Sequence, residues 1–243
     1  MELEAIIERL VLGCRILAEQ DIIDAYGHLS ARAPDRDGCF VISRGMSPAL
    51  VAAGDFLVMD FQGNVVEGDG FPNPEWPIHA CVYRARPDVG GVLHSHSMWS
   101  RVWGLSPVKL RGVLMGQSAD WNEGLPIYRD AGLIRNLERG DRVAETLGRG
   151  SAMLLRGHGD VVADGDVART VMRSITLKQN AEVLHAVLAH GQPDYWTPEE
   201  AKGWTEPMGA ALGGAAGAAL ANRALEYYEA RVNGRLRRLL QPD

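Results

Sequence analysis

The sequence predicts a single α/β domain in which a central sheet is covered by helices. The chain has 243 residues, a length that suits one large α/β domain, and no strong linker divides it. Short segments with strand character are interspersed with amphipathic segments of helical period along the whole chain. This mixture favours a sheet packed against helices, because each element must bury its apolar face on another.

The first third of the chain is expected to contain one amphipathic helix and four strands. Residues 3–19 carry apolar side chains at helical spacing. The strands are expected at residues 28–32, 39–42, 56–60 and 65–67. Pro34 and Gly38 mark the turn between the first two strands. A helix then begins at Pro77, because proline suits the first helical turn, and it ends before Pro87.

The rest of the chain continues the alternation of strands and helices. Further strands are expected at residues 91–94, 153–156 and 161–163, and further helices from near Ser97, at 131–147, after Asp166 and at 221–240. Asp166 is a suitable cap for a helix of about two dozen residues. Residues 1–205 are expected to form the main domain. Residues 206–243 join an Ala/Gly-rich segment to the last helix, and we expect them to pack at a subunit interface.

The composition argues against several classes of protein. The net charge is −6 and the charges are dispersed, so no basic stripe indicates nucleic-acid binding. No apolar run approaches the roughly 20 residues that span a bilayer, and the N-terminus lacks the pattern of a signal peptide. The three cysteines, Cys14, Cys39 and Cys81, show no metal-binding or redox spacing. We therefore expect a cytoplasmic protein that binds neither nucleic acid nor membrane.

Three histidines have the spacing of a divalent-metal site. His94 ends a buried strand and His96 lies two residues further, and side chains two residues apart on a strand point to the same face. His158 lies between two glycines, which allow a sharp turn that can bring its imidazole close to a partner. Three nitrogen ligands with an open position are typical of catalytic sites. The alternatives are a pair of polar residues at a strand end and an ordinary hairpin turn.

Glu75 is the candidate proton carrier beside this site. Prolines on both sides of it, Pro74 and Pro77, restrict the backbone and hold the carboxylate in a defined place. Beside a metal ion the carboxylate can ligate or move protons. The alternative is a favourable negative charge at the start of a helix. His79 lies four residues further on the same helical face, where it either orients Glu75 or simply packs.

Two further segments contain residues suited to binding a substrate. His28 follows Gly27, and glycine allows close backbone approach at this point. Ser43-Arg44-Gly45 follows the second strand, and the planar guanidinium of arginine suits a carboxylate or a phosphate. The alternative for Arg44 is a solvated surface charge.

These residues together resemble the class II aldolase/adducin family over about residues 3–200. The matching segments are Gly27-His28-Leu29-Ser30, Ser43-Arg44-Gly45, Pro72-Asn73-Pro74-Glu75-Trp76, His94-Ser95-His96 and Arg156-Gly157-His158-Gly159. The resemblance implies that the three histidines bind one divalent ion per subunit and that Glu75 is the catalytic acid/base. It also implies a mixed, mostly antiparallel sheet between helical layers, and a homotetramer with active sites at subunit interfaces.

The sequence departs from the sugar-phosphate aldolases and epimerases of this family. Asn73 and Pro74 replace two hydroxyl side chains that precede the glutamate in those enzymes, and proline has no N–H to donate to a phosphate. The sequence is more similar to a branch that decarboxylates hydroxylated aromatic or pyridine carboxylates. That similarity implies a small-molecule carboxylate substrate and a role for His28 in proton transfer beside Glu75. The residues that would contact the substrate are Ser43, Arg44, Gly45 and Asn73.

Several alternatives stay open at this point. Three imidazoles suit zinc, manganese, iron or cobalt. The same site would serve an aldolase, an epimerase or a dehydratase that acts on a sugar or a sugar phosphate. A non-catalytic, adducin-like interaction module is the alternative of a different class, and it predicts loss of the histidines. Polar residues that could reach a neighbouring subunit, or simply pack, are Asp120, Tyr128, Tyr227 and Tyr228.

Overall fold

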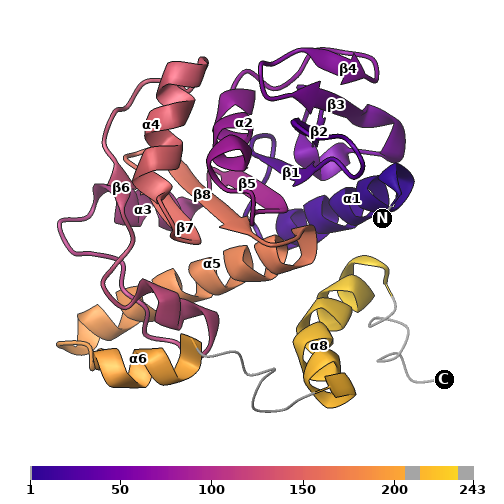
Figure 1. Ribbon diagram of the computed structural model, residues 1–243. Helices are drawn as coiled ribbons and strands as arrows, with labels where there is room; N and C mark the ends of the chain where they lie inside the picture. The colour runs from indigo at the N-terminus through magenta and orange to yellow at the C-terminus, as the bar shows by residue number, and fades with distance from the viewer. Residues whose placement is uncertain (1, 206–213, 235–243) are drawn as a thin grey trace.

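An eight-stranded sheet forms the centre of the protein in the computed structural model, which describes residues 2–205 and 214–234 (Figure 1). The strands are β1 (His28–Arg32), β2 (Cys39–Ser43), β3 (Phe56–Asp60), β4 (Val65–Glu67), β5 (Gly91–Ser95), β6 (Ile127–Tyr128), β7 (Ala152–Leu155) and β8 (Gly159–Asp164). Their order is β4-β3-β2-β1-β5-β8-β7-β6. Every pairing is antiparallel except that of β6 with β7. The expected mixed, mostly antiparallel sheet is therefore confirmed.

Helices cover both faces of this sheet. On one face lie α1 (Leu3–Glu19), α3 (Met98–Leu105) and α5 (Val167–His190), and on the other lie α2 (Trp76–Ala85) and α4 (Leu137–Leu147). The side chains of β2 show how the two cores arise. Val41 packs into the core beneath α1 and α5, whereas Phe40 and Ile42 pack into the core beneath α2. Successive strand residues point to opposite faces, so an apolar strand such as this must be covered twice.

The expected helix at residues 131–147 is wrong in its first turn and a half. α4 begins at Leu137, after Asn136, whose side chain accepts a hydrogen bond from the backbone N–H of Arg139 at 2.9 Å. Asparagine is a preferred N-cap, so it sets the start of the helix there. Residues 131–136 instead form a loop, and the N–H of Ile134 donates to Glu75.

The C-terminal region also differs from the expected helix at residues 221–240. The helix α8 runs from Gly214 to Val232, and residues 235–240 lie outside the described part of the chain. α8 lies against α1 and α5, where Arg231 pairs with Glu19 and the side-chain amide of Gln179 donates to the Tyr228 hydroxyl. Its role in a subunit interface stays a prediction.

The remaining elements are short. The helix α6 covers Pro198–Thr205, and 3₁₀ turns lie at Pro48–Leu50 (η1), Ala53–Asp55 (η2) and Gln117–Trp121 (η3). Among the residues that the structure describes, no helix is both long enough and apolar enough to cross a bilayer.

Candidate metal centre

The strand register brings most of the predicted site residues to one place on the sheet. β1 and β5 pair so that His28 lies opposite His94, and β5 and β8 pair so that Ser95 lies opposite Asp160. His158 occupies the tight turn between β7 and β8. The turn can approach β5 because residue 159 is glycine: a Cβ there would lie 1.8 Å from the carbonyl oxygen of Ser95. The predicted effect of the flanking glycine is thus visible in the geometry.

Four side chains converge at this point: Glu75, His94, His96 and His158. Their ligand atoms all lie within 4.8 Å of one another. The Nε2 atoms of His94 and His96 are 3.1 Å apart, and Oε2 of Glu75 lies 3.6 Å from Nε2 of His94 and 3.4 Å from Nε2 of His158. Glu75 and His94 are buried, and the other two are partly buried.

The chemistry of this donor set fits a divalent metal ion. Nε2 of His158 is buried and has no hydrogen-bond partner of adequate geometry. An ion with ligands about 2.0–2.2 Å away places those ligands roughly 3.3–3.6 Å apart in a tetrahedral shell. The separations from Oε2 of Glu75 fall in this range, and the pair of His94 and His96 is slightly closer. Three imidazoles and a carboxylate could therefore hold a first-row ion.

The backbone behind His94 fixes which of its nitrogens faces the centre. Nδ1 of His94 lies 2.8 Å from the carbonyl oxygen of Asp160, so Nδ1 carries the proton and Nε2 presents a lone pair. The Asp160 side chain is buried and accepts hydrogen bonds from the hydroxyls of Ser95 and Ser100. Burial raises the pKa of this carboxyl. The spacing of residues did not predict this support, although Asp160 follows Gly159 directly.

Glu75 is held at both ends. Its backbone N–H donates to the side-chain oxygen of Asn73, and its Oε1 accepts from the N–H of Ile134, each at 3.0 Å. Burial favours the neutral acid, but the adjacent imidazoles of His158 and His94 outweigh burial and hold the pKa of Glu75 well below its usual range. The carboxylate is therefore ionised at neutral pH, with Oε2 directed at the three histidines. Glu75 is also the N-cap residue that precedes α2, but its side chain makes no capping hydrogen bond there.

Two histidines, His96 in the cluster and His28 beside it, are kept neutral. Burial, followed by the proximity of His94 and His158, lowers the pKa of His96 to about 4. Burial, followed by His79 and His94, also lowers the pKa of His28 well below its usual value. A neutral imidazole is the form that can coordinate a metal ion.

His28 lies beside the cluster, in contact with His94. The ring centroids of the two histidines are 5.1 Å apart. The other neighbour of His28 is His79, whose Nε2 lies 2.5 Å from Nδ1 of His28. Both ring nitrogens of His79 are therefore occupied by His28 and Ser30, and His79 does not orient Glu75 by a hydrogen bond.

The expected substrate-binding segments lie next to the loop that carries Glu75. Arg44 forms a β-bridge with Pro72, and the N–H of Gly45 donates to the carbonyl oxygen of Phe71 at 2.7 Å. The guanidinium of Arg44 is paired with Asp55, with Nε 2.9 Å from Oδ1. Ser43 is buried at the end of β2, and Asn73 supports the backbone of Glu75 as described above. Their contact with a substrate stays a prediction.

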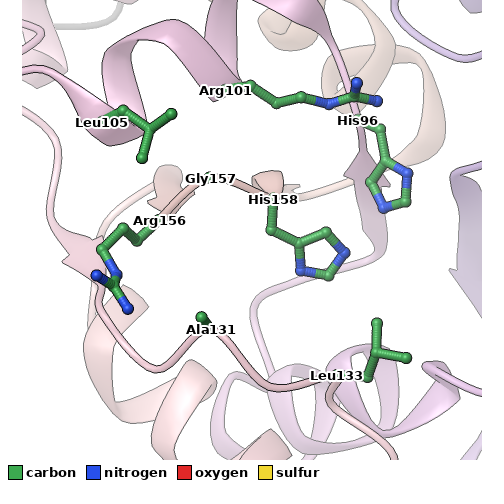
Figure 2. A pocket seen from close by; sticks show the side chains of 8 residues that line it. All are labelled: His96, Arg101, Leu105, Ala131, Leu133, Arg156, Gly157 and His158. Atoms are coloured by element: carbon green, nitrogen blue, oxygen red, sulfur yellow. The ribbon is translucent and has the colours of Figure 1, made fainter.

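A pocket opens beside the cluster, and Figure 2 shows its lining. The pocket has a volume of about 560 Å³ and is lined by His96, His158, Arg101, Arg156, Leu105, Leu133, Ala131 and Gly157. Arg101 lies on α3, and Arg156 directly precedes Gly157, where its Nε donates to the carbonyl oxygen of Arg129. Two guanidinium groups near the imidazoles give the pocket a positive charge. Neither arginine was among the site residues expected from the sequence.

The four polar residues considered for a neighbouring subunit have partners or burial within this chain. Asp120 is paired with Arg173 at 2.6 Å. The Tyr128 hydroxyl is buried and lies next to Asp130 and Arg142. The rings of Tyr227 and Tyr228 contact each other on α8. A role across an interface stays a prediction for all four.

The fold and the cluster define the class of protein: a sheet between helical layers with a histidine–glutamate centre of the kind that can hold a metal ion. The family model of the class II aldolase and adducin N-terminal domain matches residues 8–185. The chain therefore belongs to the class II aldolase/adducin family.

Known proteins of two kinds are similar to this chain. Decarboxylase tropJ of Talaromyces stipitatus is 30% identical over 73% of this chain and 74% of that protein. The 3,4-dihydroxyphthalate decarboxylase of Arthrobacter keyseri is 30% identical over 76% of this chain and 79% of that protein. An aldolase II superfamily protein from Pseudomonas syringae shares the fold, with a TM-score of 0.77 at 23% identity over 94% of this chain and 93% of that one.

Proposed function

We propose that the protein is a divalent-metal-dependent lyase that decarboxylates a hydroxylated aromatic or heteroaromatic carboxylic acid. The observation that carries the proposal is the cluster of Glu75 and three histidines beside a pocket lined by Arg101 and Arg156. The cluster suits a metal ion, and the arginines suit an anionic substrate. The similarity to two decarboxylases, one of them named for a dihydroxyphthalate, favours this reaction.

The reaction must stabilise the electron pair that remains when CO2 leaves a ring carbon. A divalent ion such as zinc, manganese, iron or cobalt, held by His94, His96 and His158 with Glu75 beside them, would supply Lewis-acid stabilisation of that charge. The chain itself supplies the rigid surroundings. The Asp160 carbonyl fixes the His94 ring, and the close approach of Gly159 to Ser95 fixes the turn that carries His158.

Glu75 is the proton carrier in this proposal. Its lowered pKa keeps the carboxylate ionised but makes it a weak base, so proton transfer from the substrate relies on the placement of Oε2 beside the histidines. The same carboxylic acid then returns a proton to the ring carbon that has lost CO2. The bond from Ile134 to Oε1 keeps the carboxylate in place during both transfers. His28, next to His94, is the second residue in contact with this region.

Binding of the substrate depends on positive charge at the pocket. Arg101 and Arg156 line it, and a guanidinium can hold a second carboxylate of the substrate with two parallel hydrogen bonds. Ser43, Arg44, Gly45 and Asn73 lie on the segments beside Glu75 and would hold a ring substituent from that side.

The alternative reactions use the same centre. Aldol cleavage, epimerisation or dehydration of a sugar or sugar phosphate would need donors for the phosphate, and Pro74 provides no N–H before Glu75. A non-catalytic, adducin-like role predicts a decayed cluster, whereas all four side chains converge here. We therefore rank decarboxylation first.

A substrate screen tests the proposal. The purified protein is loaded with zinc, manganese, iron or cobalt and incubated with hydroxybenzoates, hydroxyphthalates and hydroxypyridine carboxylates while CO2 is measured. A parallel set of sugar phosphates is assayed for aldol cleavage. We expect CO2 release from at least one aromatic acid, and none from a His158→Ala variant. Turnover of a sugar phosphate with no CO2 from any aromatic acid would overturn the proposal.

We further propose that the protein is a homotetramer whose active sites lie at subunit interfaces, with residues 206–243 contributing to one interface. The support is family membership, together with the position of α8 on the outside of α1 and α5. Light scattering coupled to size-exclusion chromatography measures the mass directly. A 26.4 kDa particle would contradict the assembly.

A further inference from the structure

A chain of buried polar side chains leads from His28 into the core, away from the metal centre. Nδ1 of His28 lies 2.5 Å from Nε2 of His79, and Nδ1 of His79 lies 2.6 Å from the Ser30 hydroxyl. The Ser30 oxygen in turn lies 2.8 Å from the Tyr83 hydroxyl. His28 is 2% exposed, and the other three are at most 1% exposed. Burying four polar groups in a row is energetically costly unless each of them forms a hydrogen bond. The hydrogen bonds between them can therefore be used to assign the position of each proton.

The number of protons in this chain sets the direction of its hydrogen bonds. Each hydroxyl has one proton, and each neutral imidazole has one. The Tyr83 hydroxyl contacts Ser30 and the backbone of Val92, and because the Val92 contact lowers the pKa of Tyr83 it is an N–H donor to the phenol oxygen; the proton of Tyr83 is then left for Ser30, and we assign Tyr83 as the donor. Ser30 then has its own proton to place, either on Nδ1 of His79 at 2.6 Å or on the carbonyl oxygen of Val92 at 3.4 Å. The shorter contact is a good hydrogen bond and the longer one is poor, which assigns the proton to His79.

The position of the proton on His79 determines the position of the proton on His28. If Nδ1 of His79 accepts from Ser30, the proton of His79 sits on Nε2 and is donated to Nδ1 of His28. The proton of His28 must then sit on its own Nε2. No other hydrogen bond of the described residues involves that Nε2 atom, so it stays available to a ligand.

We propose that His79 and Ser30 are positioning residues that lock His28 as its Nε2–H tautomer. In this form His28 is a hydrogen-bond donor, suited to a substrate oxygen that carries or gains negative charge, such as a phenolate or a carboxylate. A neutral imidazole that donates in this way stabilises developing oxyanions without transferring its proton. The identity of the substrate oxygen rests on the proposed function, but the tautomer does not.

The proposal sharpens the role of His28. In the opposite tautomer Nε2 would present a lone pair, and His28 would be a base that competes with Glu75. In the proposed tautomer the two residues divide the work: Glu75 moves the proton, and His28 stabilises the charge. The buried hydroxyls of Ser30 and Tyr83 would then set the tautomer of His28 as well as pack in the core.

Nuclear magnetic resonance of the imidazole nitrogens tests the tautomer directly. The full-length protein is labelled with ¹⁵N-histidine and loaded with zinc, which is diamagnetic, and long-range ¹H–¹⁵N correlations are recorded. His28→Gln assigns the His28 signals. We expect the pattern of a protonated Nε2 and an unprotonated Nδ1 at neutral pH. A protonated Nδ1, or an averaged mixture of both forms, would overturn the proposal.

A pair of serine variants tests whether the chain sets the tautomer. Ser30→Ala removes the donor to His79, and we expect a large part of the Nε2–H form of His28 to be lost. The matched control is Ser174→Ala, another buried serine, which lies on α5 and donates to the carbonyl oxygen of Thr170 and not to His79. We expect it to leave the His28 pattern unchanged. An unchanged pattern in Ser30→Ala would show that the chain does not control His28; if that variant does not fold, the wild-type spectrum still decides the tautomer.

Kinetics then connect the tautomer to the reaction. Where the substrate screen identifies a substrate, we expect Ser30→Ala to lower kcat with little change in KM, because the hydrogen bond from His28 strengthens as charge develops. A screen that finds no decarboxylation would refute the proposed function and leave the spectroscopic result intact. If Ser30→Ala instead raised KM and left kcat unchanged, a transition-state role for His28 would be contradicted.

Discussion

Acidification should destabilise the protein through the buried imidazole of His79. Burial, followed by the proximity of His94, lowers the pKa of His79 to about 3, and Glu75 only partly offsets this. His28, Ser30 and the stacked ring of Phe40 contact it. In the unfolded chain an ordinary histidine has a pKa of about 6.5 and binds a proton below that pH.

The sign and the size of the effect follow from this difference. The unfolded state binds more protons than the folded state between pH 6.5 and pH 3. Stability is therefore full above pH 6.5 and is lost as the pH falls toward 3. Each unit of pH in this window costs about 1.4 kcal/mol per group, so pH 5 costs roughly 2 kcal/mol for His79 alone.

Urea denaturation at pH 7, 6 and 5 measures this loss, with His79→Gln as the comparison. The variant keeps a donor and an acceptor but cannot titrate. His28 and His96, whose pKa values are also lowered, contribute to both proteins. We expect the wild type to lose roughly 2 kcal/mol more than the variant between pH 7 and pH 5. A difference in unfolding free energy that stays constant with pH would refute the reasoning.

Three further predictions concern the centre and its pocket. Glu75→Gln keeps an oxygen for the N–H of Ile134 and should preserve the fold, yet lower turnover by about 10²-fold or more in steady-state kinetics; normal turnover would leave Glu75 only a helix-start charge. Asp160→Ala leaves two buried serine hydroxyls without their acceptor and should lower the free energy of unfolding, measured by urea denaturation, by about 1–3 kcal/mol. An unchanged midpoint would show that water replaces the carboxylate. Arg101→Ala should raise KM for an anionic substrate about tenfold, whereas the control Arg9→Ala, at an exposed position on α1, should not change it. Equal KM values for the two variants would show that Arg101 does not bind the substrate.

Local patterns predicted much of the fold. The helix at Leu3–Glu19 and the strand at His28–Arg32 have the expected bounds, because apolar period and turn residues act within a few neighbours. β6 was not expected, since a two-residue strand such as Ile127–Tyr128 carries no period and exists only through its pairing with β7. The loop at residues 131–136 depends on a distant partner, the carboxylate of Glu75.

The candidate site, like the fold, could be predicted only in part from local sequence patterns. Spacing and flanking glycines were enough to predict that His94, His96 and His158 would meet. The partner of His79 could not be predicted, because helical spacing relates it to Glu75, while the tertiary fold places it against His28 on β1. The pocket arginines were missed for a similar reason: Arg101 lies on a helix face that the sequence alone does not orient toward the turn at Arg156.

The most direct test of the central claim is the metal content of the cluster. Elemental analysis and calorimetric titration with zinc or manganese are carried out on the stripped wild type and on His158→Ala. We predict one ion per chain in the wild type, and loss of that ion in the variant, whose urea-induced unfolding at neutral pH remains cooperative. A wild-type protein that binds no divalent ion, or a variant that binds it with unchanged affinity, would contradict the assignment of Glu75, His94, His96 and His158 as a metal centre.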